Sequence, residues 1–325
     1  MAAVDSAAAG AKERGIMVFR SCVFQQWLTP TLANLAAAAV LSVAMAPAVH
    51  AQMNFSSPEA AMNAFGDAVV KDREDALRKI FGNDFRDLIP PVGGELRDTF
   101  VAEWARSHTI GPTVKGRAHI VVGDNGWTFP IPLVKSSKGW HFDTSAGAED
   151  MRLRRIGRNE LAVIQTMLAI YDAQREYAQT NHDGEGVLAY ASRMVSSPGK
   201  HDGLYWPTGP DGTPSPLGDA FVDASSRNAK NAGYYGYHYK LLESQGSHAP
   251  GGAYDYVVRG KLFGGFAVIA WPVKYGDTGI KSFMVSHAGQ VYQRDLGPES
   301  AAKAGDTKSF DPGPGWSKVP DADLQ

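Results

Sequence analysis

The chain has 325 residues, of which 44% are hydrophobic and 20% are charged, and its formal net charge at pH 7 is -2. This is the composition of a globular protein long enough to bury two separate cores. No run of like charge is long enough to follow a phosphate backbone, which excludes the nucleic-acid-binding proteins.

The first part of the chain has the features of a secretory signal peptide. Residues 32–46 form an apolar run, and small residues precede a cleavage point expected after Ala51. The run is shorter than the ~20 residues that span hydrocarbon, and Pro47 interrupts it. We therefore expect a periplasmic or secreted protein without a membrane span after cleavage, translated from either Met1 or Met17.

The one cysteine, Cys22, lies inside this leader, so the mature chain would have no thiol. Disulfides, thiolate catalysis and cysteine-ligated metal centres are then excluded together. The histidines are scattered without paired spacing, and no phosphate-binding loop is present in the sequence. We therefore expect no cofactor.

Residues 52–150 are expected to form a first domain of three helices followed by an antiparallel sheet. Ser57-Pro58-Glu59 is a helix-start pattern, and residues 96–105 carry the third helix. From residue 114 the hydrophobic period changes to two, with a turn at residues 124–126. Helices followed by a curved antiparallel sheet predict an α+β fold, and the order is similar to the NTF2-like and cystatin-like folds.

Two details of this domain depend on single residues. Asp72 is expected to cap the second helix, which Gly82 would end. Pro130 and Pro132 cannot donate hydrogen bonds to a sheet, so the segment that contains them must bulge or lie at an edge of one meander.

A long amphipathic helix is expected from Arg154 to Ala178, with Leu161 on its apolar face. It would open a second domain over residues 151–300, and residues 301–325 would form a C-terminal tail. An antiparallel sheet is expected to cover the helix. Its predicted strands are residues 234–242, 254–262, 265–273, 281–286 and 290–296.

This order of long helix, variable loop and sheet resembles the soluble head domain of type II secretion pseudopilins. The apolar half-helix that packs a pilus fibre is missing, so the resemblance implies a head domain and not a fibre subunit. The residues that carry the likeness are Asn159, Glu160, Ala173, Gln174, Tyr177, Gly289 and Val291.

The mature chain as a whole resembles a family of secreted bacterial proteins known as domain of unknown function 2950. The resemblance implies a compartment and an architecture, and it implies no activity for any residue. The matching segments are WTFPIPLVK (127–135), WHFDTSAG (140–147), RRIGRNE (154–160), DGLYWP (202–207), APGGAYDYVVRG (249–260) and DLG (295–297).

Residues 154–160 form the first candidate site, because they place three arginines near the predicted start of the long helix. The helix dipole favours anions there, so one interpretation is an anion or carboxylate site. The other is an inter-domain latch in which an arginine bonds to Asp143, Glu149 or Asp150. The candidate residues are Arg154, Arg155, Arg158, Asn159 and Glu160.

The predicted cone of helices on a sheet could enclose a ligand pocket in the first domain, and its aromatic residues could equally be solid core. An open cavity facing polar groups would favour ligand binding. A filled core with an exposed aromatic patch would favour a protein partner. The pocket candidates are Phe65, Trp104, Trp127, Phe129 and Trp140.

Aromatic residues in a loop and a strand of the second half could stack on a glycan or a peptide, or pack against the sheet. The residues of this possible recognition surface are Tyr205, Trp206, Tyr235 and Tyr237. Near the same loop, Asp202, Asp211 and Asp219 are weak calcium candidates. Their spacing does not match a regular calcium loop, and loop aspartates commonly form Asx-turns.

Catalytic patterns are weak in the sequence. Gly246-Ser247-His248 is the nearest approach to a serine nucleophile, but it lacks the elbow pattern. We therefore expect a non-catalytic envelope protein that acts by protein–protein interaction. The alternatives are a small-ligand-binding protein and a hydrolase without a known motif, which would need Ser, His and acid side chains in one cleft.

Overall fold

The computed structural model describes residues 52–182, 186–208, 212–218 and 233–324. The chain divides into a unit of residues 1–49 and a unit of residues 50–325, and the described residues all belong to the second. Within them, no helix has an apolar stretch that could span a bilayer. The predicted leader lies outside the described residues.

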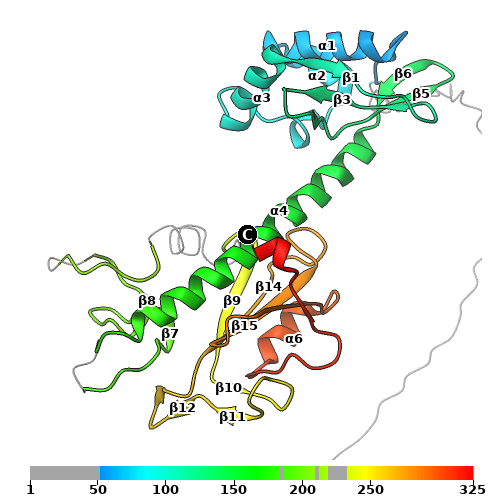
Figure 1. Ribbon diagram of the computed structural model, residues 1–325. Helices are drawn as coiled ribbons and strands as arrows, with labels where there is room; N and C mark the ends of the chain where they lie inside the picture. Colours follow the sequence, from blue (N-terminus) through cyan, green and yellow to red (C-terminus); the bar gives the residue numbers. More distant parts are fainter. Residues whose placement is uncertain (1–51, 183–185, 209–211, 219–232, 325) are drawn as a thin grey trace, which may run out of the picture. The chain divides into compact units, whose positions relative to one another are not determined.

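Three α-helices open the described part of the chain (Figure 1). Their start is as predicted, because Ser57 Oγ accepts a hydrogen bond of 3.2 Å from the backbone N–H of Ala60 and Pro58 is the first helical residue. The helices are α1 (Pro58–Val70), α2 (Glu74–Phe81) and α3 (Glu95–Arg106), with a 3-10 turn η1 (Phe85–Asp87) before α3.

The predicted Asp72 cap of α2 is wrong. The residue before α2 is Arg73, and no side chain caps the helix. Asp72 has a φ of 53°, and its carboxylate lies 2.6 Å from the guanidinium of Arg97 on α3. The carboxylate is therefore used to neutralise a buried arginine and not to cap amides.

Two small sheets follow α3, and the prediction of one meander is wrong. Pro130 and Pro132 fall between β4 and β5, where the chain leaves one sheet and enters the other. Because neither proline can donate to a ladder, the pairing stops there. All pairs are antiparallel. The first sheet has β1 (His108–Ile110), β3 (Ile120–Val122) and β4 (Trp127–Thr128), and the second has β2 (Arg117–Ala118), β5 (Leu133–Ser136) and β6 (Gly139–Phe142).

Helix α4 (Thr144–Tyr177) begins earlier than the predicted Arg154. Asp143 caps it by accepting a hydrogen bond of 3.0 Å from the N–H of Ala146. Gly147 lies against Ile131, where a Cβ would come within 2.6 Å of that side chain. The first turns of α4 therefore pack on the N-terminal module, residues 52–143, and the predicted domain boundary at residue 150 falls inside the helix.

The second half of α4 packs on a five-stranded antiparallel sheet of the C-terminal module, residues 178–324 (Figure 1). Leu161 is 50% exposed, so its predicted place on the buried face is wrong. The buried stripe contains Val163, Met167 and Ile170. The strand order is β18 (Ser317–Lys318), β16 (Val291–Asp295), β15 (Lys281–Ser286), β14 (Ala267–Pro272) and β9 (Tyr237–Leu242).

The two faces of this sheet carry two different cores. Val268 and Phe283 pack with α4, whereas Ile269 and Met284, the next residues along their strands, pack with Phe310 on the other face. This alternation is the period of two expected of strands. Residues 301–325, expected as a tail, contribute α6 (Ser300–Asp306), β17 (Ser309–Phe310), β18 and the 3-10 helix η2 (Asp321–Leu324) to the C-terminal module.

Short strands complete the C-terminal module. The predicted strand 254–262 is divided, because Arg259 and Gly260 have positive φ angles of 52° and 79° and form a hairpin turn. The remaining strands are β7 (Arg193–Val195), β8 (Gly203–Tyr205), β10 (Ser244–Gln245), β11 (Tyr254–Asp255), β12 (Val257–Val258) and β13 (Lys261–Leu262).

Candidate functional site

A cavity of about 260 Å³ lies beside the aromatic core of the N-terminal module. Its walls include Phe65 of α1, Phe100 of α3, and Trp127 and Phe129 at β4. The rings are neighbours, with centroids 4.7 Å apart for Phe65 and Phe129 and 6.2 Å apart for Phe100 and Trp127. Trp127 is 42% exposed and Phe65 is buried, so the aromatic wall runs from solvent to the core.

The structure places three of the five predicted pocket residues, Phe65, Trp127 and Phe129, on this cavity. Trp104 and Trp140 are not among its lining residues. Trp104 covers Gly66 of α1, where a Cβ would come within 2.2 Å of the indole ring. Trp140 pairs with Phe55 through two backbone hydrogen bonds and belongs to the core. The pocket prediction is therefore wrong for these two residues.

Four arginines line the same cavity: Arg97, Arg154, Arg155 and Arg158. Among the described residues, no aspartate or glutamate lines it. Arg97 is 3% exposed, and its guanidinium donates to the carbonyl of Val69 at 2.9 Å. The cavity thus combines an aromatic wall with a basic rim. Arg97 was not predicted as a site residue, since nothing in the sequence pattern of α3 indicates that this arginine is buried.

Arg154 fixes α4 to the N-terminal module. Its guanidinium donates to the carbonyl oxygen of Thr128 at 2.7 Å, pairs with Asp150 at 2.8 Å and lies 5.7 Å from the centroid of the Trp127 ring. The expected pairing with Asp150 is present. The expected helix-dipole effect is not, because α4 begins at Thr144 and these arginines lie well inside it.

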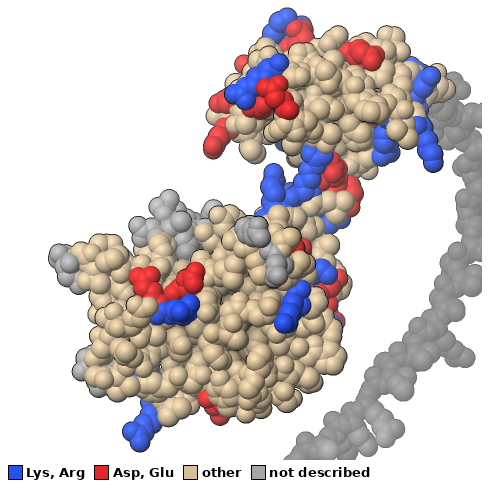
Figure 2. Space-filling model, viewed as in Figure 1, with Lys and Arg blue, Asp and Glu red and all other residues tan. Residues whose placement is uncertain are grey.

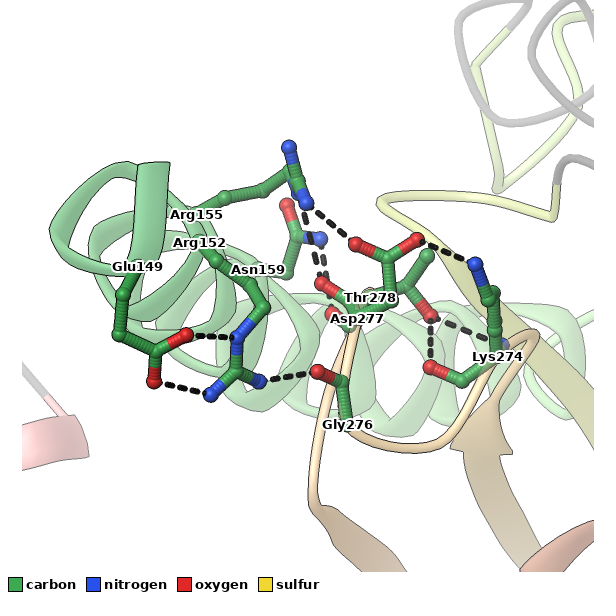
Figure 3. Close-up of polar contacts among 8 residues, drawn as sticks. All are labelled: Glu149, Arg152, Arg155, Asn159, Lys274, Gly276, Asp277 and Thr278. Atoms are coloured by element: carbon green, nitrogen blue, oxygen red, sulfur yellow. Dashed lines mark hydrogen bonds and ion pairs between the residues drawn. The ribbon is translucent and has the colours of Figure 1, made fainter. Parts of the chain in front are cut away.

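Neighbouring residues of α4 bond to residues 274–281 of the C-terminal module, and we call this set of contacts the polar junction (Figure 3). Arg155 pairs with the carboxylate of Asp277. Arg152 holds both carboxylate oxygens of Glu149, at 2.8 Å and 2.6 Å, and donates to the carbonyl of Gly276. Either Arg154 or Arg155 was expected to bond to an acid of the preceding segment; Arg154 does so, whereas Arg155 bonds to Asp277.

Asn159 and Glu160 extend the polar junction. The amide of Asn159 donates to the carbonyl of Thr278 at 2.8 Å. One oxygen of Glu160 accepts from the backbone N–H groups of Ile280 and Lys281 at 2.8 Å and 2.9 Å. Burial raises the pKa of Tyr237, which donates to the carbonyl of Lys281, and the nearby charge of Glu160 raises it further.

Basic side chains gather over the middle of α4, with acidic ones beside them (Figure 2). Desolvation raises the pKa of Asp277, but hydrogen bonds and charges from Arg155 and Lys274 outweigh it and hold that pKa below its ordinary value. The geometry therefore supports two properties: an apolar cavity with a basic rim, and a charged contact of the same helix with the loop at residues 274–281.

The model of the family DUF2950, described as a protein of unknown function, matches residues 52–319. The chain belongs to this family. The match confirms the resemblance drawn from the sequence segments and covers both modules of this DUF2950 chain. Comparisons with curated proteins and with solved structures returned no match, so the likeness to pseudopilins and to the NTF2-like and cystatin-like folds stays a prediction.

The possible recognition surface of the DUF2950 chain is only partly at the surface. Tyr235 is 50% exposed and Tyr205 is partly buried. Trp206 and Tyr237 are buried at 3% and 0% exposure in the core beneath α4, so their assignment to a surface is wrong. Burial of these rings beneath the long helix stabilises the fold more than exposure to solvent would.

Of the three calcium candidates, only Asp202 lies among the described residues. Asp202 accepts hydrogen bonds from the backbone N–H and the hydroxyl of Ser197, at 2.7 Å and 2.8 Å. Because Ser197 precedes Asp202 by five residues, the contact closes the loop between β7 and β8 and is not the expected Asx-turn. Asp211 and Asp219 lie outside the described residues. Within the described residues, no group of His, Cys, Asp and Glu side chains has the arrangement of a metal site.

The segment considered for a nucleophile contains a histidine with an acidic partner that the sequence did not indicate. His248 Nδ1 lies 3.1 Å from both carboxylate oxygens of Asp311. Desolvation raises the pKa of Asp311, but the bonds from His248 outweigh it and lower the pKa overall. Among the described residues, no serine hydroxyl is hydrogen-bonded to His248.

Proposed function

We propose that the protein binds a small apolar ligand in the cavity of the N-terminal module, as a carrier or sensor and not as a catalyst. The observation that carries the proposal is the open space beside the aromatic core. An unfilled space forfeits van der Waals contacts and lowers stability. Space that persists next to an aromatic wall and a basic rim is typical of ligand sites, which combine apolar walls with a few polar groups.

The volume limits the ligand. An apolar cavity of ~150 Å³ binds benzene, and pockets for drug-sized molecules begin at about 300 Å³. At about 260 Å³, the cavity suits one aromatic ring with a short side chain, or a short acyl chain. Larger ligands would have to extend past Trp127, which is exposed.

The test uses a neutral fluorescent probe, N-phenyl-1-naphthylamine, whose emission rises in apolar surroundings. Its phenyl ring is small enough for the cavity, and its naphthyl group would extend past the exposed Trp127. The chain should bind it at one saturable site. Leu96 lines the cavity from α3 and is 73% exposed, so Leu96→Trp should obstruct the site and weaken probe binding about tenfold, with the free energy of unfolding changed by less than about 0.5 kcal/mol.

Leu153→Trp is the matched control, because Leu153 is 49% exposed on α4 and is not a lining residue of the cavity. It should leave probe binding unchanged. Equal binding by the chain and both variants, or no saturable binding by the chain, would refute the proposed ligand site.

Export belongs to the same proposal, with the predicted cleavage after Ala51 supporting it. Expression of the full chain in a bacterium, followed by mass spectrometry of the periplasmic fraction, should yield a product that begins at Gln52. A product confined to the cytoplasm with the leader attached would contradict this part.

A second candidate function is protein–protein contact in the envelope. Leu153 and Leu161 favour it, since both are about half exposed on α4 at either side of Gly157. Affinity capture from envelope extract should recover a partner with the mature chain and lose it with Leu161→Glu. Recovery that does not depend on Leu161 would count against this surface.

A further inference from the structure

The charges at the rim of the cavity are unevenly compensated. Arg158 lines the cavity, and its side chain has no ion pair and no hydrogen bond with any of the described residues. The other three lining arginines each have a carboxylate partner. Those pairs are Arg97 with Asp72, Arg154 with Asp150, and Arg155 with Asp277.

Arg158 lies where a ligand in the cavity could reach it. It follows Arg154 by one helical turn, so both side chains leave α4 on the same side. Arg154 is held by Thr128 and by the face of the Trp127 ring. Within the part of the chain that the structure describes, Arg158 is therefore the one cavity-lining arginine without a partner, and it is exposed.

A ligand that filled the cavity would remove water from this part of the rim. A charge-assisted hydrogen bond is stronger in such surroundings, and an uncompensated guanidinium there would be costly. One negative charge on the ligand would neutralise Arg158. A neutral ligand would leave it without a partner, and a dianion would keep one charge in excess.

We propose that the ligand is a monocarboxylate, with its apolar body in the cavity and its carboxylate paired with Arg158. The body is one aromatic ring on a short chain, or a short acyl chain, as the volume requires. This inference rests on the proposed function and adds the chemical class of the ligand. The guanidinium plane matches a carboxylate with two parallel hydrogen bonds.

The experiment measures displacement of N-phenyl-1-naphthylamine at pH 7 by three ligands with the same body: 3-phenylpropanoate, 3-phenylpropanamide and 3-phenylpropyl phosphate. The carboxylate is ionised at this pH. It should bind about tenfold more tightly than the neutral amide, as expected for one hydrogen bond between charged groups. The phosphate should bind more weakly than the carboxylate.

Arg158→Gln should abolish the preference for the carboxylate over the amide, because the variant has no guanidinium to pair with the carboxylate. Arg259→Gln removes the same charge at an exposed position far along the chain and should keep the preference. Equal affinities for carboxylate and amide, tighter phosphate binding, or a preference that survives Arg158→Gln would overturn the inference while the proposed function stands. Failure of the neutral probe to bind would overturn both.

Discussion

The two modules use aromatic residues in different ways, although one helix packs on both. In the C-terminal module, Trp206, Tyr237 and Phe283 are buried with α4 in one core, and the hollows of this module lie at the edge of that core, beside Tyr177 and Leu217. In the N-terminal module, Phe65 and Phe129 are buried beside a cavity, and Trp127 remains 42% exposed at its edge. Rings buried beneath a helix are explained by stability alone. The open space beside Phe65 and Phe129 is the observation on which the proposed ligand site depends.

The arginines of α4 also differ in which module they contact. Arg154 and Arg158 lie at the cavity, whereas Arg155, although it also lines the cavity, is paired with Asp277 of the C-terminal module. The same short segment therefore serves a site and a contact. Its neutral and charged groups should therefore respond differently to substitution.

The core between α4 and the five-stranded sheet should be sensitive to loss of side-chain volume. Met167 is fully buried between α4 and the sheet. Met167→Ala should lower the free energy of unfolding by about 2–5 kcal/mol, because the methylene groups are lost and a cavity is left. Chemical denaturation measures this, with Leu161→Ala as the control within about 0.5 kcal/mol. A loss below 1 kcal/mol would mean that this core is not tightly filled.

Removing Glu160 should have the next largest effect. Its carboxylate accepts two backbone N–H groups, of Ile280 and Lys281, in a partly buried place. Glu160→Ala should lower the free energy of unfolding by about 1–3 kcal/mol, because both backbone N–H donors lose their acceptor. Glu176 is exposed near the end of the same helix, and Glu176→Ala should have little effect. Equal effects at the two positions would show that the polar junction contributes nothing at Glu160.

Acid should weaken the C-terminal contacts in a defined direction. The pKa of Asp277 is held below its ordinary value in the folded chain, so the unfolded chain binds the proton more readily. The stability that Asp277 contributes is present above the unfolded pKa, at about 3.9, and is lost as pH falls through the lower folded pKa. The free energy of unfolding, measured between pH 6 and pH 3, should therefore depend less on pH in the Asp277→Asn variant than in the unmodified chain. An unchanged slope would contradict the assigned pairing.

Local patterns allowed much of the fold to be predicted. The cap at Ser57 and strand 281–286 follow from rules that act over a few residues, and the structure confirms them. The α+β class follows from their order. The strands begin at β1, before the change of period predicted at residue 114. The start of α4 was missed because its first turns are polar and contain Gly147, whose small size serves contact with Ile131.

The site was less predictable, because its parts come from distant segments. Sequence indicated aromatic residues in the first domain but could not show that Trp104 would cover Gly66 or that Arg97 would be buried. The expected partners of Arg154 or Arg155 lay in the same segment, which holds for Arg154, whereas Asp277 reaches Arg155 from a turn after β14. No periodicity encodes such a pairing, since it depends on how the chain returns to the helix.

The smallest effect is expected at Arg155, and it tests whether the polar junction acts as a latch. The pair with Asp277 is largely open to solvent, so Arg155→Ala should cost only about 0.2–1 kcal/mol. The effect on local opening should be clearer than the effect on stability, because the loop at residues 274–281 would lose its ion pair with α4 and keep only the hydrogen bonds to Arg152, Asn159 and Glu160. Amide hydrogen exchange should rise in residues 274–281 and stay unchanged at β4, with Arg175→Ala as the control. Exchange that does not change in this loop, together with an unchanged cooperative melt, would show that Arg155 is a surface charge and not a latch.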